Sequence, residues 1–351
     1  MTLSISSIRS LLKKRGSAPP KLDLLDVPRY TRDELGLHGL TLTTDLLAGS
    51  TRDRLAGLRD AGDKAGCAAL VLVEPDPLPI AELADSKGEQ SVERLRRVLE
   101  AARLLGCSSA GFSIRGKDDE ASLERVIERM KPVVELGERL EINVLIRPSR
   151  GLTETPERTI DLVKKIGGFR IGTLPDFQSA AESDDPAGYL RRLTPYASAL
   201  LASTVELVQP DPDEAPPPPK PAKKKAGAKK ADGGKEAKGE ESQADEPVAT
   251  EEAPTEEASG DEGASEGELG ADAEGFEDLP ADLLADLEAM IDEEPAPVHT
   301  TYDLRPLVEA IVSVGYDQTL SIDYRGSGDG TLGSIMSREA LDAVFESLSD
   351  G

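Results

Sequence analysis

The stretch NVLIRPSRGLTETPERTIDLVKKIGGFRIGTLPD (143–176) holds a strand pattern, a helix pattern and a second strand pattern in order. The apolar run NVLIR (143–147) is followed at once by a proline, which ends any strand. Thr155, a favourable N-cap, stands directly before a proline at the first helical position. Gly168 then separates this helix from the apolar run FRIGTLPD (169–176), as C-terminal glycines do. The stretch predicts the strand–helix–strand unit from which parallel sheets are built.

The same alternation runs through most of the chain. Eight short apolar runs predict strands: LDLLDV (22–27), GLTLTT (39–44), AALVLVE (68–74), SAGFSIR (109–115), NVLIR (143–147), FRIGTLPD (169–176), ASALLAS (197–203) and TLSIDYR (319–325). Strands that are apolar along their whole length, each followed by a helix, predict a parallel sheet covered by helices. Eight such units predict an α/β fold, a closed (β/α)8 TIM barrel. An open doubly wound sheet is the alternative, but no Gly-rich phosphate loop follows the first predicted strand.

The charge of the chain is unevenly distributed. The net charge is −26 over 351 residues, and residues 209–298 hold 27 acidic and 8 basic side chains, so that the rest of the chain carries only −7. This region begins rich in Pro and Lys and continues as an acidic tract rich in Glu and Ala. It has few side chains able to bury apolar surface, so we expect it to be disordered. The remaining 261 residues are close to the roughly 250 of a TIM barrel.

These patterns divide the chain into an N-terminal arm (1–20), a barrel (21–208 and 299–351) and an insertion (209–298) that follows strand seven. Within the insertion, FEDLPADLLADLEAMIDEE (276–294) carries an apolar stripe that predicts a short acidic amphipathic helix near 279–293. Three roles remain open for such a helix. It docks onto the barrel, it binds a groove on a protein partner as it folds, or it forms only transiently and has no function.

Several classes of protein are disfavoured. An acidic balance argues against a nucleic-acid partner, because it repels phosphates. No apolar run approaches the length of a transmembrane helix, and the N-terminus lacks the apolar core of a signal peptide. Cys67 and Cys107 each follow a glycine just before an apolar run, which indicates packing residues. Two free thiols without a disulfide framework fit a reducing cytoplasm.

Three segments carry a family likeness: RPSRGLTETPERTIDLVKKIG (147–167), GTLPDFQSAAESDDPAGYLRRLTPYA (172–197) and VGYDQTLSIDYRG (314–326). They resemble the sugar phosphate isomerase/epimerase family, the xylose isomerase-like TIM barrels, and the likeness spans about Leu22 to Leu348. The resemblance implies a site at the C-terminal mouth of the barrel. It also implies a divalent metal (Mg²⁺, Mn²⁺ or Zn²⁺) held by a glutamate ending strand five, an aspartate ending strand six, a histidine on strand six or seven, and a glutamate on strand eight.

Residue by residue, the chain departs from the ligand set that this resemblance implies. Strand five ends in Arg147, strand six keeps its acid as Asp176, and strand eight has Asp323, one methylene shorter than glutamate. The positions where the family often shows His or Lys read Ser179, Leu201 and Ser203. The two histidines, His38 and His299, lie at the opposite rim and beside the insertion, where neither is a good ligand.

By this resemblance, Arg147 stands where the family has a metal-binding carboxylate. A guanidinium remains charged and repels a dication. We therefore expect no metal ligands, and no cofactor unless the chain is an active enzyme that uses Mg, Mn or Zn. We expect Arg147 to pair instead with Asp176 or Asp323.

Six charged residues at strand ends are the candidate site. Asp176 and Asp323 are the candidate catalytic acid/base pair, and the candidate ligand-binding residues are Glu74, Arg115, Arg147 and Arg325. The alternative is that these charges form solvated salt bridges without a ligand.

Three functions remain open. The first is a barrel with a degenerate metal site that binds a sugar-like or anionic small molecule with little metal-dependent catalysis. The second is an active sugar or sugar-acid isomerase/epimerase that works by proton transfer. The third is an interaction protein that acts through the acidic helix of the insertion.

Overall fold

A computed structural model describes residues 1–13, 19–211 and 295–349. Within these residues eight strands form one parallel sheet: β1 (Thr2–Ser4), β2 (Gly39–Thr43), β3 (Ala68–Val73), β4 (Ser109–Ser113), β5 (Asn143–Arg147), β6 (Ile171–Thr173), β7 (Ala199–Thr204) and β10 (Thr319–Tyr324). Their order across the sheet is β6-β5-β4-β3-β2-β1-β10-β7. Isolated parallel bridges, Thr173–Ala197 and Asp176–Leu201, join the chain at β6 to the chain at β7. The sheet therefore closes on itself, and the predicted TIM-barrel class is confirmed.

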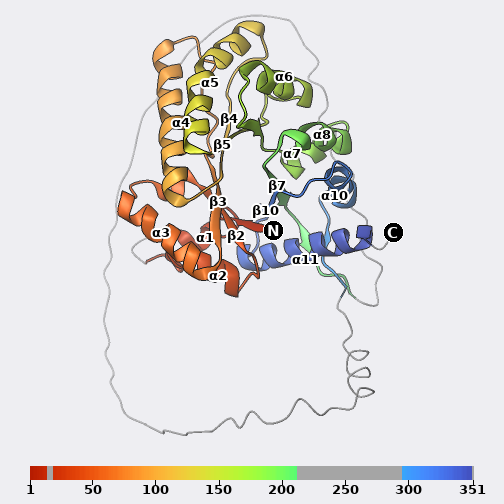
Figure 1. Cartoon of the computed structure of the whole chain (residues 1–351). Helices are drawn as coiled ribbons and strands as arrows, with labels where there is room; N and C mark the ends of the chain where they lie inside the picture. The colour runs from red at the N-terminus through yellow and green to blue at the C-terminus, as the bar shows by residue number, and fades with distance from the viewer. Residues whose placement is uncertain (14–18, 212–294, 350–351) are drawn as a thin grey trace, which may run out of the picture. The chain divides into compact units, whose positions relative to one another are not determined.

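Helices follow the strands and cover the outside of the sheet (Figure 1). The helices are α1 (Arg9–Leu12), α2 (Val27–Asp33), α3 (Arg52–Ala65), α4 (Asp85–Leu105), α5 (Glu120–Leu140), α6 (Pro156–Ile166), α7 (Phe177–Ala181), α8 (Pro186–Leu193), α10 (Arg305–Val312) and α11 (Gly330–Ser349), with short 3₁₀ turns η1 (Thr44–Leu47) and η2 (Thr194–Tyr196). The predicted start of α6 is confirmed, because the Thr155 side chain accepts a hydrogen bond from the Arg158 amide. Gly66, after α3, adopts the left-handed conformation (φ 62°) that glycine tolerates best.

The first strand was misplaced by the sequence patterns. Leu22–Val27 is not a strand: the Asp23 side chain accepts a hydrogen bond from the Leu25 amide, and α2 begins at Val27. The short side chain of aspartate can bond to a nearby backbone amide in this way, and such local bonds compete with the backbone pairing of a strand. The first strand is Thr2–Ser4, which lies between β2 and β10 within the sheet. This part of the predicted N-terminal arm therefore belongs to the barrel.

Two apolar layers hold the barrel together. A small cluster of Val71, Val73, Leu145, Leu174, Ala199 and Leu201 forms one of them. The larger one packs the sheet against its helices and includes the fully buried Phe112 and Phe177. Cys67 and Cys107 are buried and free. Burial raises the pKa of Cys67 to about 11 and that of Cys107 to about 12, so both remain neutral thiols in the packed interior.

A two-stranded antiparallel ribbon stands where the insertion leaves the barrel. It pairs β8 (Leu207–Val208) with β9 (Val298–His299), opposing Leu207 to His299 and Val208 to Val298. The ribbon brings the two ends of the insertion together. The predicted amphipathic helix near 279–293, and with it the partner segment 276–294, lies outside the described residues. No helix in the described part of the chain is long and apolar enough to cross a membrane.

Candidate functional site

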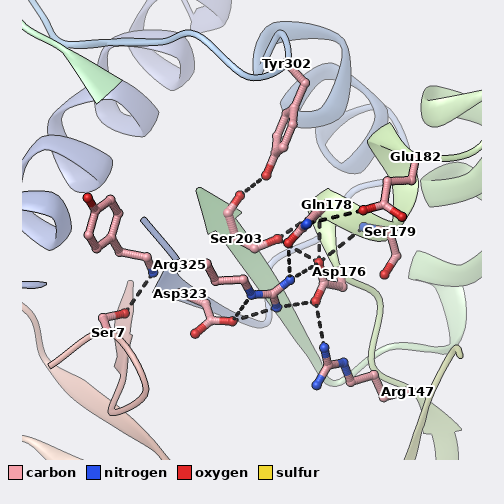
Figure 2. A network of polar contacts seen from close by, with 11 residues as sticks. Ser7, Arg147, Asp176, Gln178, Ser179, Glu182, Ser203, Tyr302, Asp323 and Arg325 are labelled. Atoms are coloured by element: carbon pink, nitrogen blue, oxygen red, sulfur yellow. Dashed lines mark hydrogen bonds and ion pairs between the residues drawn. The ribbon is translucent and has the colours of Figure 1, made fainter. Parts of the chain in front are cut away.

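The parallel strands bring four of the six predicted charged residues together at the barrel mouth (Figure 2). Arg147 ends β5, Asp176 follows β6 as the N-cap of α7, and Asp323 lies on β10 two residues before Arg325. The register of the sheet sets Asp323 beside Ser203 of β7. Parallel strands end at the same rim, so these side chains meet although the chain separates them widely.

Asp176 is the centre of this network. Its Oδ1 accepts hydrogen bonds from Ser203 Oγ (2.7 Å), the Gln178 amide (2.9 Å) and Arg325 Nη1 (3.2 Å). Its Oδ2 accepts from Arg325 Nη2 and from Arg147 Nη2 (3.4 Å). The predicted ion pair between Arg147 and Asp176 is therefore present. Both carboxylate oxygens are occupied by donors.

Arg325 joins the two carboxylates. Its Nε and Nη2 lie 2.8 and 2.6 Å from Asp323 Oδ2, and its Nη1 donates to Gln178 Oε1 (2.8 Å). The side chains of Arg147 and Arg325 are 28% and 25% exposed, whereas those of Asp176 and Asp323 are 1% and 7% exposed. The carboxylates are thus buried beneath two guanidinium groups, and the solvent side of the network is cationic.

The aspartates and arginines of the network each stabilise the charged form of the other. Burial on its own raises the pKa of Asp176, but attraction to Arg325 and Arg147 and the hydrogen bonds to its oxygens outweigh burial and hold that pKa below its ordinary value. Burial on its own lowers the pKa of Arg325, and the two aspartates raise it above its ordinary value. Both groups are therefore charged at neutral pH.

A buried His–Tyr pair, not predicted from the sequence, supports Ser203. The Tyr302 hydroxyl donates to the Ser203 carbonyl oxygen. His299 lies 4.2 Å from Tyr302 between ring centres. Its Nε2 accepts from the Val205 amide (2.9 Å), so Nδ1 carries the proton and donates to the Tyr302 carbonyl (2.7 Å). Both nitrogens of His299 are engaged, and the ring acts as a neutral packing group.

We expect His299 to titrate below the ordinary histidine value of about 6.5, because burial lowers its pKa more than its neighbours raise it. Just below this value, His299 is protonated in the unfolded state but stays neutral in the folded state. Stability should fall as the pH drops below about 6.5 and should be insensitive to this group above it. A proton NMR titration checks the pKa, with His299→Gln to assign the signals. A midpoint for His299 above 6.5 contradicts the expectation.

A cleft of about 430 Å³ opens beside the network. It is lined by Ser6, Ser7 and Ser10 after β1, by Arg147, and by the continuous segment from Asp323 to Gly328. Its volume lies within the 300–1,000 Å³ typical of small-molecule sites. The three serines were missed in the sequence because the first strand was misplaced. Had MTLSIS been read as a strand, they would have fallen at the mouth.

Glu74 and Arg115 lie apart from this cleft. Glu74 is buried and accepts hydrogen bonds from Thr44 Oγ1 (2.9 Å) and Arg94 Nε (2.7 Å). Arg115 is exposed and donates to the Pro77 carbonyl (2.9 Å). Neither residue lines the cleft. The network therefore unites Arg147, Asp176, Asp323 and Arg325 and leaves these two predicted residues outside.

The residues at the mouth do not fit a divalent metal. Among the described residues, no group of three or more His, Cys, Asp and Glu side chains is placed to hold an ion. Asp176 already accepts six hydrogen bonds, and two guanidinium groups lie within ion-pair distance of it. Metal ligands must offer free lone pairs, and a dication is repelled by neighbouring cations.

The sequence of residues 33–212 matches the model of the xylose isomerase-like TIM barrel family. The match covers half of the chain, and the chain belongs to this family. A comparison with curated protein sequences finds no match.

Solved structures show the same fold. An L-ribulose 3-epimerase is 11% identical with a TM-score of 0.62, over 99% of this chain and 94% of that one. A D-tagatose 3-epimerase-like protein is 16% identical with a TM-score of 0.57, over 99% and 98%. A xylose isomerase-like TIM barrel protein from Mycobacterium smegmatis, in complex with magnesium, is 12% identical with a TM-score of 0.58, over 99% and 97%. These likenesses show that the fold is shared with sugar epimerases.

Proposed function

We propose that the barrel mouth binds a sugar-like small molecule without the help of a divalent metal. The observation that carries this proposal is the network in which Arg147 and Arg325 hold Asp176 beside a cleft of about 430 Å³. The fold is shared with sugar epimerases, and the cleft has the volume of a small-molecule site and is lined by serine, arginine and aspartate side chains.

The electrostatic cost of adding a metal supports this view. At an effective dielectric constant of about 20, two unit charges about 4 Å apart interact by about 4 kcal/mol, and a dication doubles that figure. Binding a divalent ion at Asp176 would also require breaking its bonds to Arg325. Arg147, which makes one hydrogen bond within the described residues, instead offers N–H donors to the oxygens of a ligand, as metal ions offer coordination.

Metal analysis of the purified full-length chain tests the proposal. After dialysis against Mn²⁺ or Mg²⁺ we expect no stoichiometric metal, and we expect sugar binding by calorimetry to be the same with and without EDTA. Arg147→Glu is the informative variant, because it replaces the cation with a ligand-type side chain and should raise the affinity for Mn²⁺. Stoichiometric metal in the unmodified protein, together with sugar binding that EDTA abolishes, would overturn the proposal.

A metal-free proton transfer is the second candidate function, and one observation favours it. Asp323 Oδ1 is buried and has no hydrogen-bond partner among the described residues, while Asp323 lines the cleft. A carboxylate oxygen in that position can accept a proton from a bound sugar. Asp176 is less suited, because donors occupy both of its oxygens. Incorporation of solvent deuterium into a bound ketose, lost in Asp323→Asn, is the expected signature, and its absence across aldoses and ketoses would exclude this candidate.

A further inference from the structure

We infer that the ligand of the mouth is anionic, with its oxyanion held by Arg147 and the β10–α11 loop and a hydroxyl group donated to Asp323. This inference rests on the proposed function and specifies the chemistry of the ligand. The oxyanion is the carboxylate or the phosphate group of a hydroxylated molecule of monosaccharide size.

Arg147 has unused donors that face the cleft. Its single hydrogen bond within the described part of the chain joins Nη2 to Asp176, at 3.4 Å. The other amino group points away from Asp176 (Figure 2), and Arg147 lines the cleft. A guanidinium with a free edge is the group best shaped for two parallel hydrogen bonds to a carboxylate or phosphate.

The loop after β10 adds neutral donors to the same cleft. Gly326, Ser327 and Gly328 line it, and their amides make no hydrogen bond to the other described residues. The loop is closely packed: a side chain at Gly326 would lie 2.2 Å from the Tyr324 hydroxyl, and one at Gly330 would lie 2.0 Å from the Ser7 carbonyl oxygen. Packing therefore fixes the loop at Gly326 and at its junction with α11, while Ser327 and Gly328 are exposed. A run of backbone amides without partners is a favourable arrangement for an anion.

Asp323 supplies an independent second observation. Its side chain is 7% exposed, its Oδ2 accepts from Arg325, and its Oδ1 has no partner within the described residues. Buried carboxylate oxygens are rarely left unpaired. An anionic group on the ligand cannot satisfy this oxygen, whereas a hydroxyl group can donate to it. The cleft thus offers an acceptor for a hydroxyl and, at Arg147 and the loop, donors for an oxyanion.

The arrangement of charge in the mouth agrees with an anionic ligand. Arg147 and Arg325 are the exposed members of the network and the two aspartates are the buried ones. An approaching ligand meets positively charged guanidinium groups before it meets carboxylate oxygens. This order favours an oxyanion over a cation at the entrance.

Calorimetry with matched pairs of sugars tests the inference on the full chain. The probes are D-glucose, D-gluconate and D-glucose 6-phosphate, with D-xylose and D-xylonate as a second pair and inorganic phosphate alone. We expect the acids to bind more tightly than the neutral sugars, and the carboxylate and phosphate arms to identify which oxyanion is preferred. Arg147→Gln should weaken binding of the acids about tenfold or more, and should weaken binding of the neutral sugars clearly less.

Two further variants keep the test decisive. Arg150→Gln removes the same charge from an exposed arginine in the loop after β5, three residues beyond Arg147. Arg150 does not line the cleft, so this variant should leave the affinities unchanged. Ser327→Asp places a negative charge on the exposed loop without touching the ion-pair network, and should weaken binding of the acids alone. If neutral sugars and acids bind equally and Arg147→Gln changes neither, the oxyanion subsite is wrong while the proposed function stands. If no probe binds, both fail.

Discussion

Replacing Asp176 with asparagine should lower the free energy of unfolding by about 3 kcal/mol, since removing one partner of a buried ion pair leaves the other uncompensated. The asparagine amide would face Arg325 with a donor where the carboxylate accepted, and Arg147 would lose its one acceptor within the described residues. Both guanidinium groups keep some contact with solvent, which places the loss at the lower end of the usual 3–5 kcal/mol. For a domain of this size the unfolding midpoint should fall by roughly 6–12 °C.

The pH dependence gives this prediction a second measurement. The pKa of Asp176 is depressed in the folded state, so its contribution is complete above the unfolded value of about 3.9 and is lost as the pH falls through the lower folded value. The difference between wild type and Asp176→Asn should therefore be constant near neutral pH and shrink below about pH 4.

Asp118→Asn is the matched control for Asp176→Asn. Asp118 pairs with Arg158 at 2.7 Å but is 56% exposed, and exposed pairs contribute less than about 1 kcal/mol. Equal losses in the two variants, measured by chemical denaturation, would show that Asp176 is not the buried centre of a network.

Leu3→Ala should lower the free energy of unfolding by about 2–5 kcal/mol, the usual cost of truncating a buried leucine. Leu3 is 0% exposed and lies on β1, where it pairs with Leu40 of β2 and Ile322 of β10. Leu3 belongs to the apolar layer that packs the sheet against its helices, so its truncation would open a cavity in that layer. Urea denaturation, followed by far-ultraviolet circular dichroism, measures the change.

Leu25→Ala is the control for this experiment. Leu25 lies in the segment that the sequence patterns assigned to the first strand, but it is 39% exposed, so its truncation should change the free energy of unfolding by less than about 0.5 kcal/mol. The reverse ranking, with Leu25→Ala the more damaging, would restore Leu22–Val27 as the central strand and refute the structural assignment of β1.

The seven later strands of the sheet, β2 to β7 and β10, were predictable because each is an apolar run with a glycine or proline near one end. The predicted total of eight was right only because the misplaced strand at Leu22–Val27 was counted instead of β1. β1 was not predictable, because Thr2–Ser4 is too short for a periodic pattern and takes its place only through pairing with β2 and β10. Such long-range pairing overrides local preference.

The candidate site was predictable to the extent that strand ends converge. Arg147, Asp176, Asp323 and Arg325 meet because parallel strands share a rim. The direction in which a side chain points cannot be predicted from the sequence. Arg115 was therefore grouped with these residues, although its side chain donates to the Pro77 carbonyl at the surface. The roles of these residues in binding or catalysis stay predictions.

The position of β1 has a consequence for how the protein is made. Of the strands in this sheet, β1 is the first to leave the ribosome, and one of its two neighbours, β10, is the last. Until then β1 has an unpaired edge, and the barrel cannot complete its ring while the insertion is still being translated. Nascent chains should therefore become resistant to protease late, in one step, rather than gradually as each helix emerges.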